Sequence, residues 1–197
     1  ALQSQITPHF LYNTLNSIRY AAMLQNATIV SDMLSALVEL LQLSAGKKEA
    51  FISVREEIQQ VKNYVILQMF RYRDLFSISY EIDEEVLDYK VPKLILQPLV
   101  ENSIQHGISL RKGGGKICIR ARKVGSDIVF EVEDNGVGMT EEKIREILYS
   151  EENSAKKFCG IGIKNVNERI KLYFGEPYGL TYRTAKNGGT IARILIP

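Results

Sequence analysis

The chain has 197 residues and a formal net charge of +2, from 25 basic and 23 acidic side chains. Its composition, 45% hydrophobic and 24% charged, is ordinary for a globular protein and excludes collagen-like and disordered classes. The near-neutral charge, without long runs of one sign, excludes an electrostatic nucleic-acid footprint. Two distant cysteines, Cys118 and Cys159, and two histidines fit no zinc spacing and favour a reducing compartment.

The first predicted element is a helix over residues 9–22. Apolar residues recur along it at intervals of three and four and so line one face. A polar row with the same spacing occupies the opposite face. This row consists of His9, Asn13, Asn16 and Tyr20.

Two further helices are expected before residue 75, and no strand. One covers residues 29–44 and stops at Gly46. The other begins at Ser53, where Ser53 and Glu56 have the spacing of a capping box.

The second part of the chain alternates strands with helices. Its expected strands are 76–82, 117–121, 128–132, 180–184 and 190–196, and its expected helices run from Pro92 to His106, over 140–149 and over 163–174. Of the 14 glycines, only Gly46 lies before residue 107. We therefore predict an α+β chain whose helical part, residues 1–74, precedes a sheet-containing part, residues 75–197.

Three punctuated segments in the second part carry candidate chemistry. They are residues 99–107, 134–139 and 160–165. Taken singly, each has an ordinary explanation as a turn, a tight connection or the solvated face of a helix. In this order, they resemble the N, G1 and G2 boxes of the GHKL ATPases, the family of gyrase, MutL and histidine kinases. The resemblance implies a Bergerat-type α/β sandwich, a mixed sheet under a helical layer, that binds ATP with Mg²⁺.

The resemblance also implies roles for individual residues. Asp134, at the end of a strand, would accept a hydrogen bond from the adenine amino group. Asn102 would give a hard oxygen ligand to Mg²⁺, and helix N-terminal amides after Gly160 would face phosphate. The full nucleotide-binding set is Asn102, Gln105, His106, Asp134, Gly136, Gly138, Gly160, Gly162, Lys164, Asn165 and Thr190. For His106 a purely structural role stays equally open.

Gln105 departs from the pattern, because many relatives have a phosphate-contacting lysine at this position. Other cations would then be needed near the phosphates. The candidates are Lys156 and Lys157 in the expected ATP lid (residues 150–159), Lys164, Arg111 and Lys112.

Residues 3–16 resemble the phosphoacceptor box of LytS/YehU-type sensor histidine kinases, and residues 91–102 continue the likeness, so it covers essentially the whole chain. It implies that residues 1–74 form dimerisation and phosphoacceptor helices and that residues 75–197 form the catalytic ATP-binding domain. The implied partners are a second copy of the chain and a response regulator, with no nucleic acid. Because the chain starts at Ala1 in mid-pattern, we expect a fragment whose missing upstream segments anchor it to the cytoplasmic side of the membrane.

The likeness makes His9 the phosphoacceptor, since a neutral imidazole offers a nucleophilic lone pair. Asn13, one turn later, would position water for dephosphorylation, and Glu101 would polarise water or metal. Phe10 stands where many histidine kinases have an acidic residue that acts as base. Two alternatives therefore stay open: a nucleotide-binding dimer scaffold without kinase activity, and a hydrolytic GHKL ATPase.

Overall fold

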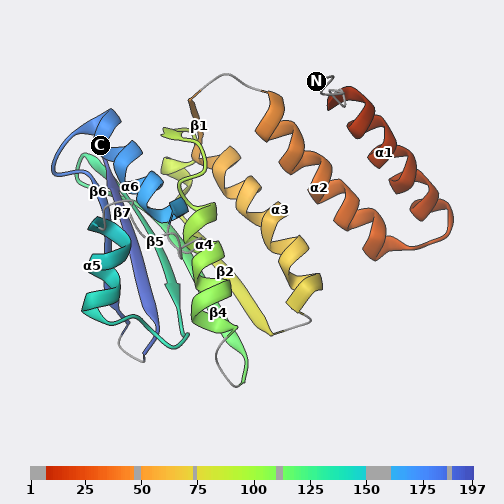
Figure 1. The fold of residues 1–197 in the computed structure, drawn as a ribbon. Coiled ribbons are helices and arrows are strands. Elements are labelled where there is room, and N and C mark those ends of the chain that lie inside the picture. Colours follow the sequence, from red (N-terminus) through yellow and green to blue (C-terminus); the bar gives the residue numbers. More distant parts are fainter. Residues whose placement is uncertain (1–7, 47–49, 73–74, 110–112, 150–160, 186–187) are drawn as a thin grey trace, which may run out of the picture.

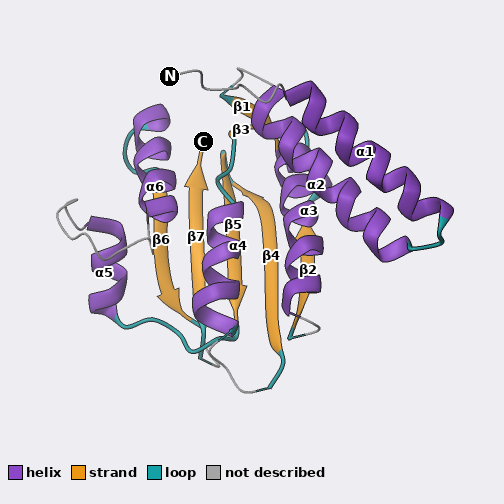
Figure 2. Ribbon diagram, turned by 45° about the vertical axis from the view of Figure 1, so that its right-hand side comes forward, coloured by secondary structure: helices purple, strands orange, loops and turns teal. Residues whose placement is uncertain are grey.

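A computed structural model describes residues 8–46, 50–72, 75–109, 113–149, 161–185 and 188–197. Two helices, α1 (Pro8–Leu24) and α2 (Thr28–Gly46), lie side by side at one edge of the molecule (Figure 1). The remainder is a five-stranded sheet with helices layered over one face (Figure 2). The predicted α+β class, with helices first and a mixed sheet under a helical layer, is confirmed.

The α1–α2 pair confirms both helices expected in the first 46 residues. Its turn contains Asn26, whose φ of 54° lies in the left-handed region that asparagine tolerates better than most residues. The Tyr12 hydroxyl donates a hydrogen bond of 2.9 Å to the Leu41 carbonyl and so joins the two helices at their far ends from this turn.

Helix α3 (Val54–Tyr72) begins with the predicted capping box. The Ser53 N–H donates to Glu56 Oε2 at 2.8 Å, and the Glu56 N–H donates to Ser53 Oγ at 3.2 Å. The buried face of α3 belongs to the same hydrophobic core as the sheet. The contributing residues of α3 are Val54, Ile58, Val61, Tyr64 and Val65. The division of the chain at residue 74 stays a prediction.

A short antiparallel strand pair lies where the sequence predicted none. β1 (Phe51–Ser53) pairs with β3 (Lys90–Pro92), with Ile52 opposite Val91. The expectation of no strand before residue 75 is therefore wrong. Three residues are too few to show alternation, and their partner strand lies in a distant part of the sequence.

The helix expected from Pro92 to His106 begins later than predicted, and its last residues are π-helical. Pro92 closes β3, and helix α4 starts five residues later and covers Gln97–Asn102. Between them Leu94 adopts a φ of 57°, which an α-helix does not accommodate. After α4 the chain continues as a π-helical turn over Ser103–Ile108.

The main sheet has the strand order β2-β4-β5-β7-β6. β2 (Phe76–Ile82) runs parallel to β4 (Gly115–Val124), and all other neighbouring pairs are antiparallel. The remaining strands are β5 (Asp127–Asp134), β6 (Gly179–Thr184) and β7 (Thr190–Ile196). These strands confirm the five that the alternation predicted.

Helices α5 (Glu141–Tyr149) and α6 (Ile161–Phe174) complete the described part of the chain and confirm two further predictions. Gly175, with a φ of 73°, ends α6 as a left-handed C-cap. One face of the sheet is buried under α3, α4 and α6 (Figure 2). The opposite face carries paired charged side chains.

Candidate nucleotide and phosphoacceptor sites

The Asp134 carboxylate, at the end of β5, is the centre of the candidate nucleotide site. The residue is 3% exposed. Its Oδ1 accepts the Gly136 N–H at 2.8 Å, and its Oδ2 accepts the Ser103 hydroxyl at 3.0 Å. Burial raises the pKa of Asp134, and these two bonds together with one from the Thr190 N–H oppose that rise. The donors come from three separate segments, which the fold brings to one carboxylate.

Glycines allow these segments to pack backbone against backbone. A Cβ added to Gly107 would lie 2.9 Å from Asp134 Oδ1. A Cβ on Gly136 would overlap the Gly107 backbone, and one on Gly189 would overlap the Asp134 carbonyl. The N-box segment, the G1 segment and residues 188–190 before β7 therefore meet around Asp134.

The N-box segment supplies both the expected residues and one that was missed. Asn102 ends α4 and is half-buried, and Ser103, which sequence reasoning passed over, donates to Asp134. The Gln105 amide donates to Glu101 Oε1 at 3.1 Å, so these two predicted residues contact each other. His106 lies half-buried in the π-helical turn.

The G2 segment is only partly described. Gly162 lies in the first turn of α6, and a Cβ there would approach Pro98 of α4 at 3.4 Å. Lys164 forms a 3.7 Å ion pair with Glu168, and Asn165 is exposed. The predicted residues that fall outside the described ranges are Gly160, the lid over 150–159 with Lys156 and Lys157, Arg111 and Lys112.

His9 lies apart from this cluster, on the exposed surface of α1. Asn13 Nδ2 lies 3.4 Å from each of the two ring nitrogens of His9, so the side chains are in contact one turn apart. Phe10, in place of an acidic neighbour, is 64% exposed. Helices α2 and α3 separate α1 from the sheet (Figures 1 and 2). His9 and the cluster around Asp134 therefore lie in two separate parts of the molecule.

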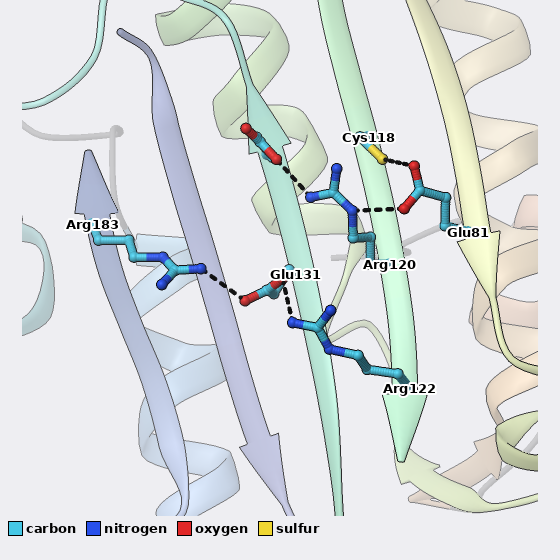
Figure 3. Close-up of polar contacts among 7 residues, drawn as sticks. Glu81, Cys118, Arg120, Arg122, Glu131 and Arg183 are labelled. Atoms are coloured by element: carbon cyan, nitrogen blue, oxygen red, sulfur yellow. Dashed lines mark hydrogen bonds and ion pairs between the residues drawn. The ribbon is translucent and has the colours of Figure 1, made fainter. Parts of the chain in front are cut away.

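The sheet face turned away from the helices carries a paired charge ladder that the sequence did not predict (Figure 3). Arg120 bridges Glu81 at 2.8 Å and Glu133 at 2.6 Å. Arg122 and Arg183 each contact Glu131 at 3.1 Å and cover this carboxylate. Because these charges neutralise one another within the sheet, the ladder joins the strands rather than attracting a charged ligand.

Across the described ranges, no helix is long and apolar enough to cross a membrane. Within the same ranges, no group of three or more histidine, cysteine, aspartate or glutamate side chains is placed to hold a metal ion.

The N-terminal and C-terminal parts of the chain each match a known protein family. The family model described as "Histidine kinase" matches residues 1–76, and the model "Histidine kinase-, DNA gyrase B-, and HSP90-like ATPase" matches residues 88–197. The chain is 39% identical to the sensor histidine kinase YesM of Bacillus subtilis over its full length, and 33% identical to the sensor protein LytS of Staphylococcus saprophyticus over 98% of it. It spans about a third of the length of each of these relatives, 33% and 32%.

The histidine kinase domain of the blue-light activated histidine kinase EL346 from Erythrobacter litoralis has a similar fold. The TM-score is 0.56 at 18% sequence identity, over 96% of this chain and 93% of that one. The structural likeness supports the fold, and the family models and relatives establish the family. The chain belongs to the histidine kinases, with an ATPase domain of the kind shared with DNA gyrase B and HSP90.

Proposed function

We propose that this chain is the catalytic core of a sensor histidine kinase that phosphorylates itself on His9 and then passes the phosphoryl group to an aspartate of a response regulator. The observation that supports this most is the cluster around Asp134. Three glycine-containing segments converge there on a buried carboxylate, as adenine recognition by this family requires.

The Asp134 carboxylate has the acceptor capacity that adenine needs. A carboxylate offers about four lone-pair positions. Three are engaged, by the Gly136 N–H, the Ser103 hydroxyl and the Thr190 N–H. The fourth would accept the amino group of adenine.

Asn102 fits the role of a magnesium ligand. Its carboxamide oxygen is a hard donor, and Mg²⁺ in nucleotide sites takes one or two protein ligands together with phosphate and water. The residue is half-buried at the end of α4, within the N-box segment that contacts Asp134. When bound, Mg²⁺ neutralises phosphate charge, which is most of what phosphoryl transfer asks of the site.

His9 would act as the nucleophile. An imidazole nitrogen attacks the γ-phosphorus, an N–P bond forms, and the bond to the β,γ-bridging oxygen breaks as ADP leaves with the electron pair. Asn13 would set the tautomer of this ring and so determine which nitrogen attacks. An amide can present either its oxygen or its NH₂ group; if the oxygen accepts the ring N–H, the other nitrogen keeps its lone pair. With Phe10 next to it, the exposed ring loses its proton to solvent.

The α1–α2 pair would form the dimer interface. Several large apolar side chains on these helices are exposed in the single chain, which a helix bundle of two chains would bury. They include Phe10, Leu11, Ile18, Met23, Leu24, Ile29 and Val30. We place this core on the cytoplasmic side of the membrane, attached through upstream segments.

Incubation with γ-labelled ATP and Mg²⁺ tests the proposal against its alternatives. Acid-labile, base-stable label that is absent in His9→Gln and in Asp134→Asn supports the kinase. ATP binding without label, in protein that includes its native upstream region, would favour the nucleotide-binding scaffold. Steady phosphate release that persists in His9→Gln would instead favour the hydrolytic ATPase.

A further inference from the structure

Glu57, near the start of α3, is a charged residue with no exposed surface and no place in the proposed chemistry. Its carboxylate accepts the N–H of Leu94 and the N–H of Leu96, each at 2.8 Å. Burial of a carboxylate is costly unless it is hydrogen-bonded and faces a positive charge. Burial raises the pKa of Glu57, and the backbone N–H donors of residues 94–96, together with the charge of Arg169, oppose that rise.

Arg169, on α6, holds the same loop from the other side. Its Nη2 donates to the Leu94 carbonyl at 2.9 Å. Both backbone polar groups of Leu94 are therefore engaged by charged side chains, one from α3 and one from α6. We call Glu57, Leu94 and Arg169 the loop clamp.

The clamped residue is strained. Leu94 has a φ of 57°, a left-handed conformation that is unfavourable for a residue with a side chain. Its side chain is 38% exposed, so packing does little to select this conformation. Such strain persists only where the surroundings over-determine it, and the clamp is the over-determining feature.

The clamp sits at the start of the helix that carries Asn102. Leu96, held by Glu57, is the N-cap of α4, and its carbonyl accepts the N–H groups of Leu99 and Val100 at 3.0 and 3.1 Å. The first turn of α6 approaches α4 at Pro98. The direction of the short α4 is therefore set at its first turn by groups from α3 and α6.

We propose that Glu57 and Arg169 are positioning residues, which hold Leu94 in its strained conformation and so aim Asn102 at the nucleotide-bound Mg²⁺. This rests on the proposed nucleotide site. Neither residue is among those that would contact ATP. Replacing them should therefore change only the placement of the α4 side chains. Base recognition by Asp134 should be retained, because its Gly136 and Thr190 donors lie on segments that the loop clamp does not hold.

The test is a calorimetric titration of ADP, with Mg²⁺ and with EDTA, into the full chain and its variants. Arg169→Met keeps an apolar stem and removes the donor to Leu94. We expect the gain in ADP affinity due to Mg²⁺ to fall about 10-fold, the lower end of the range for partners of metal ligands, while the affinity in EDTA stays within about twofold of wild type. Lys171→Met, on the same helix in an exposed pair with Glu176, is the control and should change neither value.

A second comparison identifies the clamped strain as the cause. Glycine adopts a φ of 57° at little cost, so Leu94→Gly should restore most of the Mg²⁺ gain to Arg169→Met. If that variant does not fold, Arg169→Lys, which keeps one donor and the charge, should show an intermediate loss. Unchanged Mg²⁺ dependence, an equal loss with and without Mg²⁺, or no rescue by Leu94→Gly would overturn the clamp. Absence of ADP binding in the wild-type chain would refute the proposed nucleotide site instead.

Discussion

The ionised carboxylate of Asp134 lowers the stability of the folded chain. Its pKa is raised by burial in spite of three hydrogen-bond donors, so the ionised carboxylate is costlier in the folded chain than in the unfolded one. Because the folded chain binds this proton more tightly than the unfolded chain, protonation of Asp134 favours the folded state. Ionisation therefore lowers stability as pH rises from the unfolded pKa through the folded pKa, and at neutral pH that cost is fully present.

Asp134→Asn should separate stability from binding. The Asn oxygen can still accept the Gly136 N–H, and the Ser103 hydroxyl can turn to accept from the amide. We expect a melting temperature at neutral pH at least equal to that of wild type, with nucleotide binding abolished because adenine loses its acceptor. Any stability gain should shrink as the pH is lowered into the range where carboxylates protonate. Thermal unfolding against pH, beside calorimetric titration, checks this; a marked fall in melting temperature together with intact binding would contradict it.

Two tyrosine hydroxyls that differ in their hydrogen bonding can be compared. Among the described residues the Tyr182 hydroxyl has no hydrogen-bond partner, whereas the Tyr12 hydroxyl donates to Leu41 at 2.9 Å. Tyr12→Phe should therefore cost about 1 kcal/mol of unfolding free energy, and Tyr182→Phe should cost nothing or stabilise the chain. Denaturant unfolding measures both values. A larger loss in Tyr182→Phe than in Tyr12→Phe would show that the Tyr182 hydroxyl is engaged.

The sequence points to candidate binding residues that belong to a recognisable motif, and it gives no signal for residues that act through the fold. Asp134 follows a strand and precedes two glycines, so its role could be inferred. Ser103 has no such signal, because its contact with Asp134 joins two segments 31 positions apart. Its place directly after Asn102 was the one hint available. Glu57 reads as an ordinary helix-surface residue until the fold turns it toward Leu94 and Leu96.

Helices and strands were predicted correctly where the stabilising hydrogen bonds join residues that are close together in the sequence. The capping box of α3 was predicted from Ser53 and Glu56 because the bonding groups are three residues apart. The β1–β3 pair was missed because its bonds are long-range. The start of α4 was misplaced because Leu94 is held in its conformation by side chains from α3 and α6, which no propensity of the loop itself encodes.

Removal of the cap should weaken α3 measurably. Ser53→Ala leaves the Glu56 N–H without its acceptor and should lower the free energy of unfolding by about 0.5–2 kcal/mol. Ser53→Thr keeps the hydroxyl and should retain most of the stability. Chemical denaturation of the two variants beside wild type tests this. Equal stability of Ser53→Ala and wild type would mean that packing of α3 in the core, rather than the cap, determines where the helix starts.

At the scale of the whole molecule, the acceptor helices differ from the sheet domain in how well one chain buries them. The sheet-containing part buries most of its apolar residues in one core, while the predicted apolar stripe of α1 is partly uncovered: Leu11 is 39% and Ile18 48% exposed, and Ala22 is buried. The stripe was correctly read as the apolar face of a helix. What covers Leu11 and Ile18 is, in our proposal, a second chain.

Ile18→Glu should therefore shift the protein toward monomer, since a charge would be buried in the bundle. Ser17→Glu, one position away on the exposed polar side, should leave the dimer intact. Sedimentation velocity over a range of concentrations distinguishes the two. A monomeric wild-type chain, or a dimer unaffected by Ile18→Glu, would place the interface elsewhere.

In the proposed mechanism, ATP bound at the cluster around Asp134 supplies the phosphoryl group that His9 receives. Mass spectrometry of the intact and digested chain after incubation with ATP and Mg²⁺, under conditions that preserve phosphoramidates, tests it most directly. We expect one added phosphoryl group on the peptide that contains His9, absent in both His9→Gln and Asp134→Asn. Phosphorylation that persists in His9→Gln, or that maps to another residue in the wild-type chain, would contradict it.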